Sequence, residues 1–163
     1  MTEKQNMSLE TILKRSIMIT ELRTRALGIP IKLNLPKNDV EIYGSFNQLA
    51  QVFCNILQNS YESLLEKRKT QSTFVGLISI RATAKDQTLR IDFQDNGVGI
   101  EESVKEHIFD PLYTSKDPEK HSGLGLTLAA QILKDHGAKI EVSSQKDGKT
   151  CVSLRFPQTR RDL

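Results

Sequence analysis

The sequence predicts an α+β domain, a two-layer α/β sandwich with three main helices on one face of a mixed, mostly antiparallel sheet of about five strands. Two observations favour this class. Apolar residues recur at helical spacing over 45–64, whereas over 31–35 and 88–94 they alternate with polar residues. The links between most strand-like runs are short enough for hairpins, and elements with one apolar face must bury it against a second layer.

The composition describes one ordinary globular domain. The chain has 163 residues, 37% of them hydrophobic and 26% charged, with a net charge of +3. This balance predicts no nucleic-acid partner. The N-terminus is polar and no apolar run reaches the roughly 18 residues of a membrane span. We therefore expect a cytoplasmic chain without membrane contact of its own, whose parent protein can still be membrane-anchored. Cys54 and Cys151 lack metal-ligand spacing and are expected to be buried or half-buried thiols.

The first 44 residues hold one expected helix and two short strands. Residues 1–7 are expected to be frayed. Ser8 precedes apolar residues at helical spacing and is the expected cap of a helix that ends near Gly28. The alternation over 31–35 and the run 40–44 predict the two strands.

The longest expected helix covers 45–64, with Ser45 as its N-cap. The pattern then predicts a polar turn at 67–72, strands at 74–84 and 88–94, a short helix at 101–108, a loop at 110–122, a helix at 123–135 stopped by Gly137, and closing strands at 139–144 and 150–156. Loops as long as 110–122 are usually functional or mobile.

Two carboxamides and a carboxylate follow one edge of the long helix. Asn55 and Asn59 are four residues apart and Glu62 follows three later, so the three share a helix edge. Asn is a middling helix former and is unfavourable when buried without a partner. By itself the pattern fits either a solvated, amide-rich face or a binding edge.

Two glycine-containing runs have chemistry suited to a nucleotide. Asp95 follows a strand and enters the run DNGVGI, where Gly97 and Gly99 permit a tight backbone that a ligand can approach, although Asp-Asn-Gly is also a common turn signal. Gly123 and Gly125 begin a helix, and N–H groups at a helix N-terminus attract phosphate. An ordinary glycine-rich junction would look the same. The run is neither a Walker loop nor a dinucleotide fingerprint.

The three groups occur in the order metal, base, phosphate. Asn oxygens ligate Mg²⁺ weakly and leave water and phosphate oxygens to complete the octahedron. A carboxylate at a strand end can accept a hydrogen bond from an exocyclic amine such as that of adenine. Glycines at a helix start leave room for phosphate.

These runs resemble the sequence boxes of the ATP-binding (Bergerat) fold shared by DNA gyrase, MutL proteins and sensor histidine kinases. The boxes read QVFCNILQNSYES at 51–63, DNGVGI at 95–100, IFDPLYTSK at 108–116 and SGLGL at 122–126. A closing GKT at 148–150 is similar to the last turn of the family. The resemblance covers roughly residues 8–157, with every box in order.

The resemblance implies ATP and Mg²⁺ as ligands. Asn59 would be the main Mg²⁺ ligand, assisted by Asn55. Asp95 would bind the adenine amine, helped by a water. The remaining implied base contacts are Gly97, Gly99, Ile100 and Thr150.

The resemblance also implies a phosphate side. Residues 110–121 would form a lid, with Lys116 as a phosphate contact. The start of the third helix would hold the phosphates, through Ser122, Gly123, Leu124, Gly125 and Leu126. His121 stands where the family often has Gly, which suggests a stiffer lid hinge.

Asn55 indicates a branch of the family. The hydrolytic relatives typically have a Glu there that activates water, and a carboxamide cannot accept a proton usefully near neutral pH. The resemblance therefore implies a sensor histidine kinase catalytic domain, in which the γ-phosphate goes to a histidine. Glu62 resembles the Glu of nitrogen-regulation-type kinases. It either orients the acceptor or a metal-bound water, or is simple surface charge.

The histidines His107, His121 and His136 do not open a helix of the phospho-acceptor type. We therefore expect 1–28 to be a linker helix toward a separate dimerisation and phospho-acceptor domain, 29–158 to be the ATP-binding catalytic domain and 159–163 a tail. A response-regulator receiver domain is the further implied partner. Two alternatives stay open: an anti-sigma-type serine kinase, and a non-catalytic binding module of the same fold, which only His121 favours.

Overall fold

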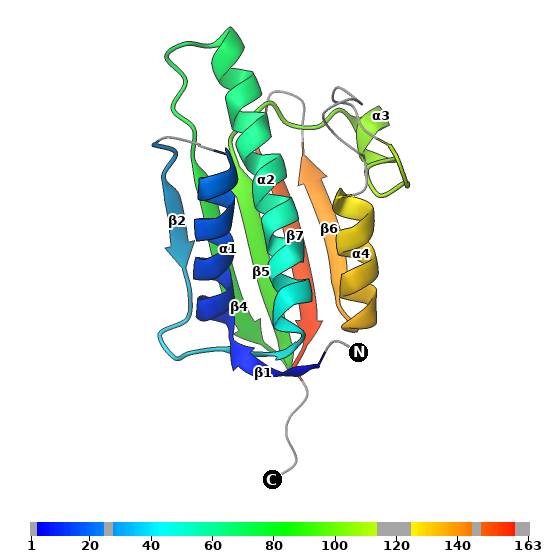
Figure 1. The fold of residues 1–163 in the computed structure, drawn as a ribbon. Coiled ribbons are helices and arrows are strands. Elements are labelled where there is room, and N and C mark those ends of the chain that lie inside the picture. Colours follow the sequence, from blue (N-terminus) through cyan, green and yellow to red (C-terminus); the bar gives the residue numbers. More distant parts are fainter. Residues whose placement is uncertain (1–2, 25–27, 114–124, 145–147, 159–163) are drawn as a thin grey trace.

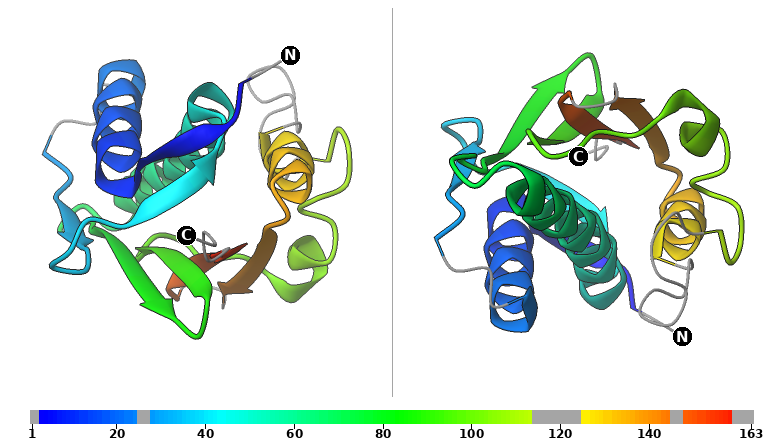
Figure 2. Two further views of the ribbon diagram at one scale, coloured as in Figure 1. Left: turned by 90° about the horizontal axis from the view of Figure 1, so that it is seen from below. Right: turned by 90° about the horizontal axis from the view of Figure 1, so that it is seen from above.

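The fold has two layers, a five-stranded sheet and the helices on one of its faces (Figures 1 and 2). It comes from a computed structural model that describes residues 3–24, 28–113, 125–144 and 148–158. The helices are α1 (Leu9–Thr24), α2 (Phe46–Thr70), α3 (Glu102–Lys105) and α4 (Gly125–Asp135). The strands are β1 (Gln5–Ser8), β2 (Ile31–Asn34), β3 (Glu41–Gly44), β4 (Ile78–Lys85), β5 (Thr88–Asp95), β6 (Lys139–Ser144) and β7 (Thr150–Pro157).

The strand order of the main sheet is β2-β4-β5-β7-β6. Strand β2 runs parallel to β4, and the other pairs are antiparallel. The register places Asp95 opposite Thr150 and Thr150 opposite Ser144, so these three residues form one row across β5, β7 and β6. The predicted sandwich, with its mixed, mostly antiparallel sheet and its three main helices α1, α2 and α4 on one face, is confirmed.

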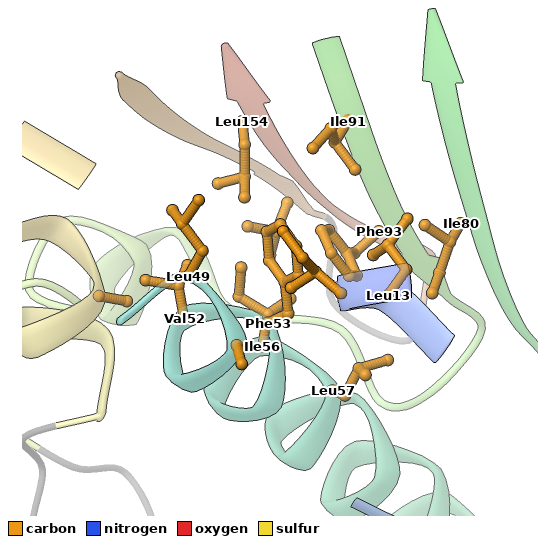
Figure 3. Packing of buried hydrophobic residues seen from close by; sticks show 14 of the residues in the cluster. Leu13, Leu49, Val52, Phe53, Ile56, Leu57, Ile80, Ile91, Phe93 and Leu154 are labelled. Carbon is orange, nitrogen blue, oxygen red and sulfur yellow. The ribbon is translucent and has the colours of Figure 1, made fainter. Parts of the chain in front are cut away.

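The core lies between α2 and the sheet (Figure 3). Phe53 of α2 is fully buried, and its ring centroid lies 5.6 Å from that of Phe93 of β5. Truncating a core Phe to Ala costs about 3–5 kcal/mol, so this layer contact is a major part of the stability. Because the apolar stripe of α2 is held by the sheet, the rotation of the helix about its axis is fixed. Its polar edge is therefore fixed as well.

Helix α2 is longer than the sequence pattern predicts. Ser45 caps it as expected, since the Gln48 backbone N–H donates to Ser45 Oγ at 3.4 Å. The predicted polar turn at 67–72 is wrong for 67–70, because the helix continues to Thr70. The cations Lys67, Arg68 and Lys69 fill its last turn, where they interact favourably with the helix dipole.

The N-terminal segment is more ordered than predicted. The expectation of a frayed start is wrong for residues 5–7, because β1 pairs antiparallel with β3. Ser8 caps α1 as expected, accepting a hydrogen bond from the Thr11 N–H at 3.3 Å. Helix α1 packs against α2, with Ile12 and Leu13 fully buried. The division of the chain at residue 28 stays a prediction.

Strand β4 begins at Ile78, four residues later than predicted. The side chain of Asn96 explains the difference, because it binds the chain on both sides of Gly76. Its Oδ1 accepts from the Leu77 N–H at 2.7 Å, and its Nδ2 donates to the Val75 carbonyl at 3.0 Å. The Leu77 N–H and the Val75 carbonyl thus bind the Asn96 side chain and not a neighbouring strand, so β4 begins only after them.

Two turns of the fold contain residues with positive φ angles. The β4–β5 hairpin turns at Asp86 and Gln87, which have φ angles of +50° and +59°, as a two-residue turn of matching twist requires. Gly137, at φ +66°, ends α4 as predicted. The predicted helix at 101–108 is reduced to α3, followed by turns. Across the described ranges, none of the helices has the length and apolarity that crossing a bilayer requires.

Candidate nucleotide site

The polar edge of α2 faces the start of α4. Asn55 Nδ2 donates to the Gly125 carbonyl at 3.0 Å. Since this amide nitrogen is bound to protein, the Oδ1 atom of Asn55 is the one oriented away from Gly125. Two of the predicted boxes, 70 residues apart in the sequence, are therefore in direct contact.

Asn59 and Glu62 lie further along the same helix, and both are half-buried. Gln58 Nε2 donates to Glu62 Oε1 at 2.8 Å, which holds the carboxylate against the helix surface. A half-buried edge with amide oxygens and one carboxylate offers the oxygen ligands that a hard cation prefers.

The loop after β5 carries Asp95, which is only 4% exposed. Asp95 Oδ1 accepts a hydrogen bond from the Gly97 N–H at 2.9 Å, a local bond that orients the carboxylate at the strand end. Gly99 has a φ of +74°, a conformation that side chains other than glycine rarely adopt.

A row of hydroxyls extends from Asp95 across the sheet. The Oγ of Ser144 and the Oγ1 of Thr150 are 2.7 Å apart, and both side chains are buried. The Ile100 N–H donates to Ser144 Oγ at 2.8 Å. The structure thus brings together four sites of the sequence prediction (Asp95, Gly97, Ile100 and Thr150), and Ser144 connects two of them.

Gly97 is needed because the loop touches α2. A Cβ at this position would lie 2.1 Å from Ser63 Oγ and 2.8 Å from the Ser63 backbone carbon. The same Ser63 Oγ accepts a hydrogen bond from the Val98 N–H at 3.0 Å. The loop is therefore seated directly on the helix that carries Asn55 and Asn59.

Four residues with structural roles at the site were missed by sequence reasoning. They are Ser63, Lys67, Asn96 and Ser144. The sequence does contain a pattern that could have identified Ser63 and Lys67, because they continue the four-residue interval of Asn55 and Asn59 along α2. Asn96 and Ser144 had none, since Asn96 binds the 75–77 segment and Ser144 binds the Ile100 N–H, 44 residues away, and no sequence pattern pairs these positions.

The phosphate side of the prediction is only partly described. Gly125 and Leu126, in the first turn of α4, are half-buried. Thr127 Oγ1 donates to the Phe109 carbonyl at 3.0 Å, which ties α4 to the segment before the predicted lid. The other predicted phosphate-side residues, Lys116, His121, Ser122, Gly123 and Leu124, lie outside the described residues.

One buried and one half-buried group have raised pKa values. Burial, with a smaller contribution from Glu21, raises the pKa of Tyr61 to about 12. Burial also raises the pKa of the Cys151 thiol, which keeps it protonated at neutral pH. Both cysteines are free and half-buried, as the sequence predicts.

Comparison with curated proteins gives several sensor kinases. The chain is 30% identical over 155 residues to sporulation kinase A of Bacillus subtilis, covering 95% of this chain and 24% of that protein. It is 35% identical over 127 residues to the sensory histidine kinase/phosphatase NtrB of Rhizobium leguminosarum, covering 73% and 32%. The chain spans about a quarter of the length of the first relatives it matches.

Solved structures share the fold, and a family comparison covers most of the chain. The catalytic domain of histidine kinase ThkA superposes with a TM-score of 0.78 at 24% identity, covering 96% of this chain and 97% of that one. The mycobacterial sensor histidine kinase MprB gives a TM-score of 0.78 at 18% identity, covering 95% and 97%. At these identities the likeness concerns the fold. Residues 44–160 match the family of histidine kinase-, DNA gyrase B- and HSP90-like ATPases. The chain therefore belongs to this ATPase family, within its sensor histidine kinase branch.

Proposed function

We propose that this domain binds Mg-ATP and transfers the γ-phosphoryl group to a histidine of a separate acceptor domain in its parent protein. A phosphorus–nitrogen bond forms to the imidazole, and the bond between the γ-phosphorus and the bridging oxygen breaks. ADP leaves, and the displaced imidazole proton passes to solvent. A receiver domain of a response regulator is then the next phosphoryl acceptor.

The observation that carries this proposal is Asn55. Its amide donates to the Gly125 carbonyl, at the contact between the metal edge and the start of α4. A carboxamide there supplies no general base for water, so the γ-phosphate is kept for another nucleophile. Catalysis then rests on positioning and on charge neutralisation, as in other phosphoryl transfers.

The donor set on α2 fits Mg²⁺. Asn59 and Asn55 offer amide oxygens on one helix edge, and Glu62 adds a carboxylate nearby. We assign Asn59 as the principal ligand and Asn55 as its assistant. When bound, Mg²⁺ neutralises charge on the phosphates. Glu62, held by Gln58, orients the incoming imidazole.

The purine is assigned to the Asp95 end of the sheet. Asp95 accepts the exocyclic amine, and its orientation by the Gly97 N–H supports this role. Ile100 and Gly99 form the wall of the pocket, and Thr150 approaches the base from β7. We assign the phosphates to the first turn of α4, with Lys116 and residues 122–124 completing that side.

The test uses γ-labelled ATP and a separately supplied acceptor-histidine domain. We expect magnesium-dependent labelling of the acceptor that is lost in acid and stable in base, the pattern of phosphohistidine. An acid-stable label would instead favour the serine-kinase alternative, and binding without transfer would favour the binding module. Absence of any magnesium-dependent ATP association would overturn the proposal.

A further inference from the structure

A stripe of four polar residues runs along α2 at four-residue intervals: Asn55, Asn59, Ser63 and Lys67. Its first member contacts the start of α4, and its last two contact the loop after β5. The distance along the helix is about 18 Å at 1.5 Å per residue. One rigid helix therefore spans both ends of the proposed nucleotide site.

Lys67 makes the most contacts at the loop end of this stripe. Its Nζ donates to the Asn96 carbonyl at 3.1 Å and to the Gly97 carbonyl at 3.0 Å. The same ammonium lies 4.9 Å from the centroid of the Phe74 ring, on its face. Hydrogen bonds from a charged donor are roughly twice as strong as neutral ones, and the aromatic face adds a cation–π contact.

The two carbonyls that Lys67 binds directly follow Asp95. Ser63, one turn before Lys67, holds the next residue through the Val98 N–H. On the other side of the loop, the Asn96 side chain is bound to the 75–77 segment. Two consecutive peptide groups, 96–97 and 97–98, are thus bound by side chains of α2, and the Asp95 carboxylate accepts the N–H of the first.

We propose that Lys67 is a positioning residue for nucleotide recognition, which holds the 95–98 loop on α2 so that Asp95 is presented to the purine in one orientation. The inference rests on the proposed function for the identity of the ligand, but not for the loop contact itself. Because the loop is already ordered before binding, the ligand does not bear the entropic cost of ordering it, and the affinity for the nucleotide is higher. Lys67 touches the carbonyls of the loop and acts on the nucleotide through Asp95.

The test compares three variants of the last turn of α2. Lys67→Met keeps the length and the contact with Phe74 but removes the ammonium. Lys67→Arg keeps a charged donor. Lys69→Met is the matched control, because Lys69 is exposed and its ammonium forms an ion pair with Glu66 at 2.8 Å on the surface of α2. ADP affinity is measured by calorimetry, and amide hydrogen exchange is followed along the whole chain without ligand.

We expect Lys67→Met to weaken ADP binding about tenfold, the change that corresponds to one charge-assisted hydrogen bond. Amide exchange should accelerate at 97–99 and stay unchanged in α1 and in the central strands, which a global loss of stability would not produce. Lys67→Arg should restore most of the affinity, and Lys69→Met should stay within about twofold of the unmodified chain.

Unchanged ADP affinity together with unchanged exchange at 97–99 in Lys67→Met would overturn the proposal. So would equal losses in Lys67→Met and Lys69→Met, or faster exchange across the whole chain. If the unmodified chain binds no ADP, the proposed function fails instead. The local exchange measurement then decides by itself whether Lys67 holds the loop.

Discussion

The two ends of the site differ in how many of their groups are already bound by the protein. At the base end, the 95–100 loop is held by side chains from α2 and β6 and by its own Asn96. At the phosphate end, within the described residues, α4 is joined to its neighbours through Asn55 and Thr127. The base end is therefore built before the ligand arrives.

This difference separates two tasks. Recognising a purine requires a fixed acceptor and a shaped wall, which rigid elements supply best. Transferring a phosphoryl group between two proteins requires access for the acceptor, which a fully enclosed phosphate end would deny. The comparison predicts that substitutions at the base end act on binding of any adenine nucleotide. Substitutions at the phosphate end should act chiefly on the ligands that carry phosphates.

The largest effect is expected from Asp95→Asn. The amide oxygen can still accept the Gly97 N–H, so the loop keeps its shape, but the charged acceptor for the purine amine is lost. We expect ADP affinity to fall about 100-fold, measured by calorimetry, because hydrogen bonds to a charged group are the strong ones. The matched control is Asp92→Asn on the same strand, whose carboxylate binds Arg90 and Ser153 on the opposite face of the sheet. Equal behaviour of the two variants would contradict the assignment of Asp95.

A glycine pair compares the two ends directly. A Cβ at position 97 would lie 2.1 Å from Ser63 Oγ, whereas one at position 125 would lie 3.8 Å from Asn55 Cγ, an ordinary contact. We expect Gly97→Ala to lower the free energy of unfolding by about 1–3 kcal/mol, as overpacking does. It should also weaken ADP and adenosine equally.

Gly125→Ala should leave the stability unchanged or raise it by about 0.5–1 kcal/mol, since alanine favours a helix. Its affinity for adenosine should be preserved and its affinity for ATP reduced. Chemical denaturation and calorimetry measure both quantities. Loss of adenosine binding in this variant would remove the distinction between the two ends.

The smallest effect concerns the buried side of α2. In the described chain the Tyr61 hydroxyl is buried without a hydrogen-bond partner, and burial raises its pKa to about 12. Removing an unpaired hydroxyl is nearly neutral or stabilising, so Tyr61→Phe should gain up to about 1 kcal/mol at pH 8 and leave ADP affinity unchanged.

The pH dependence of this variant has a definite sign. Tyr61 ionises near pH 10 in the unfolded chain but only near 12 in the folded one. Ionisation therefore favours the unfolded chain, so the free energy of unfolding is unaffected by this group below pH 10 and falls as the pH rises from 10 toward 12, by up to about 1.4 kcal/mol per pH unit. Urea denaturation at pH 8 and 11 should therefore show that the advantage of Tyr61→Phe grows at pH 11. A constant difference would indicate that the hydroxyl ionises equally in both states.

Sequence patterns predicted the parts of the molecule that depend on periodicity and local chemistry. The stripe around Phe53, the cap at Ser45 and the stop at Gly137 are local signals, and all three are present. Patterns did not predict the extension of α2 through Lys67, because a run of cations reads equally well as a turn or as a helix end. They could not predict that Ser144 and Thr150 share a hydrogen bond with one another beneath Ile100, since strand register brings those hydroxyls together.

His136 joins the far ends of the two helices that carry the site. Its Nδ1 donates to the Ile132 carbonyl at 2.7 Å, and its Nε2 accepts the Ser45 N–H at 3.1 Å. Both roles require the neutral imidazole in a single tautomer. Gly44 is needed beside it, because a Cβ there would lie 2.6 Å from the His136 ring.

The His136 imidazole is thus a fixed point of contact between the two helices. The C-terminal end of α4 is fixed to the N-terminal end of α2 through His136, and at the other end of α4 the Asn55 amide donates to the Gly125 carbonyl. Gly125 is the end of α4 that lies farthest along the helix from the His136 contact, so a tilt of α4 about that contact would displace Gly125 most. Such a tilt would therefore alter the proposed phosphate end of the site more than the base end.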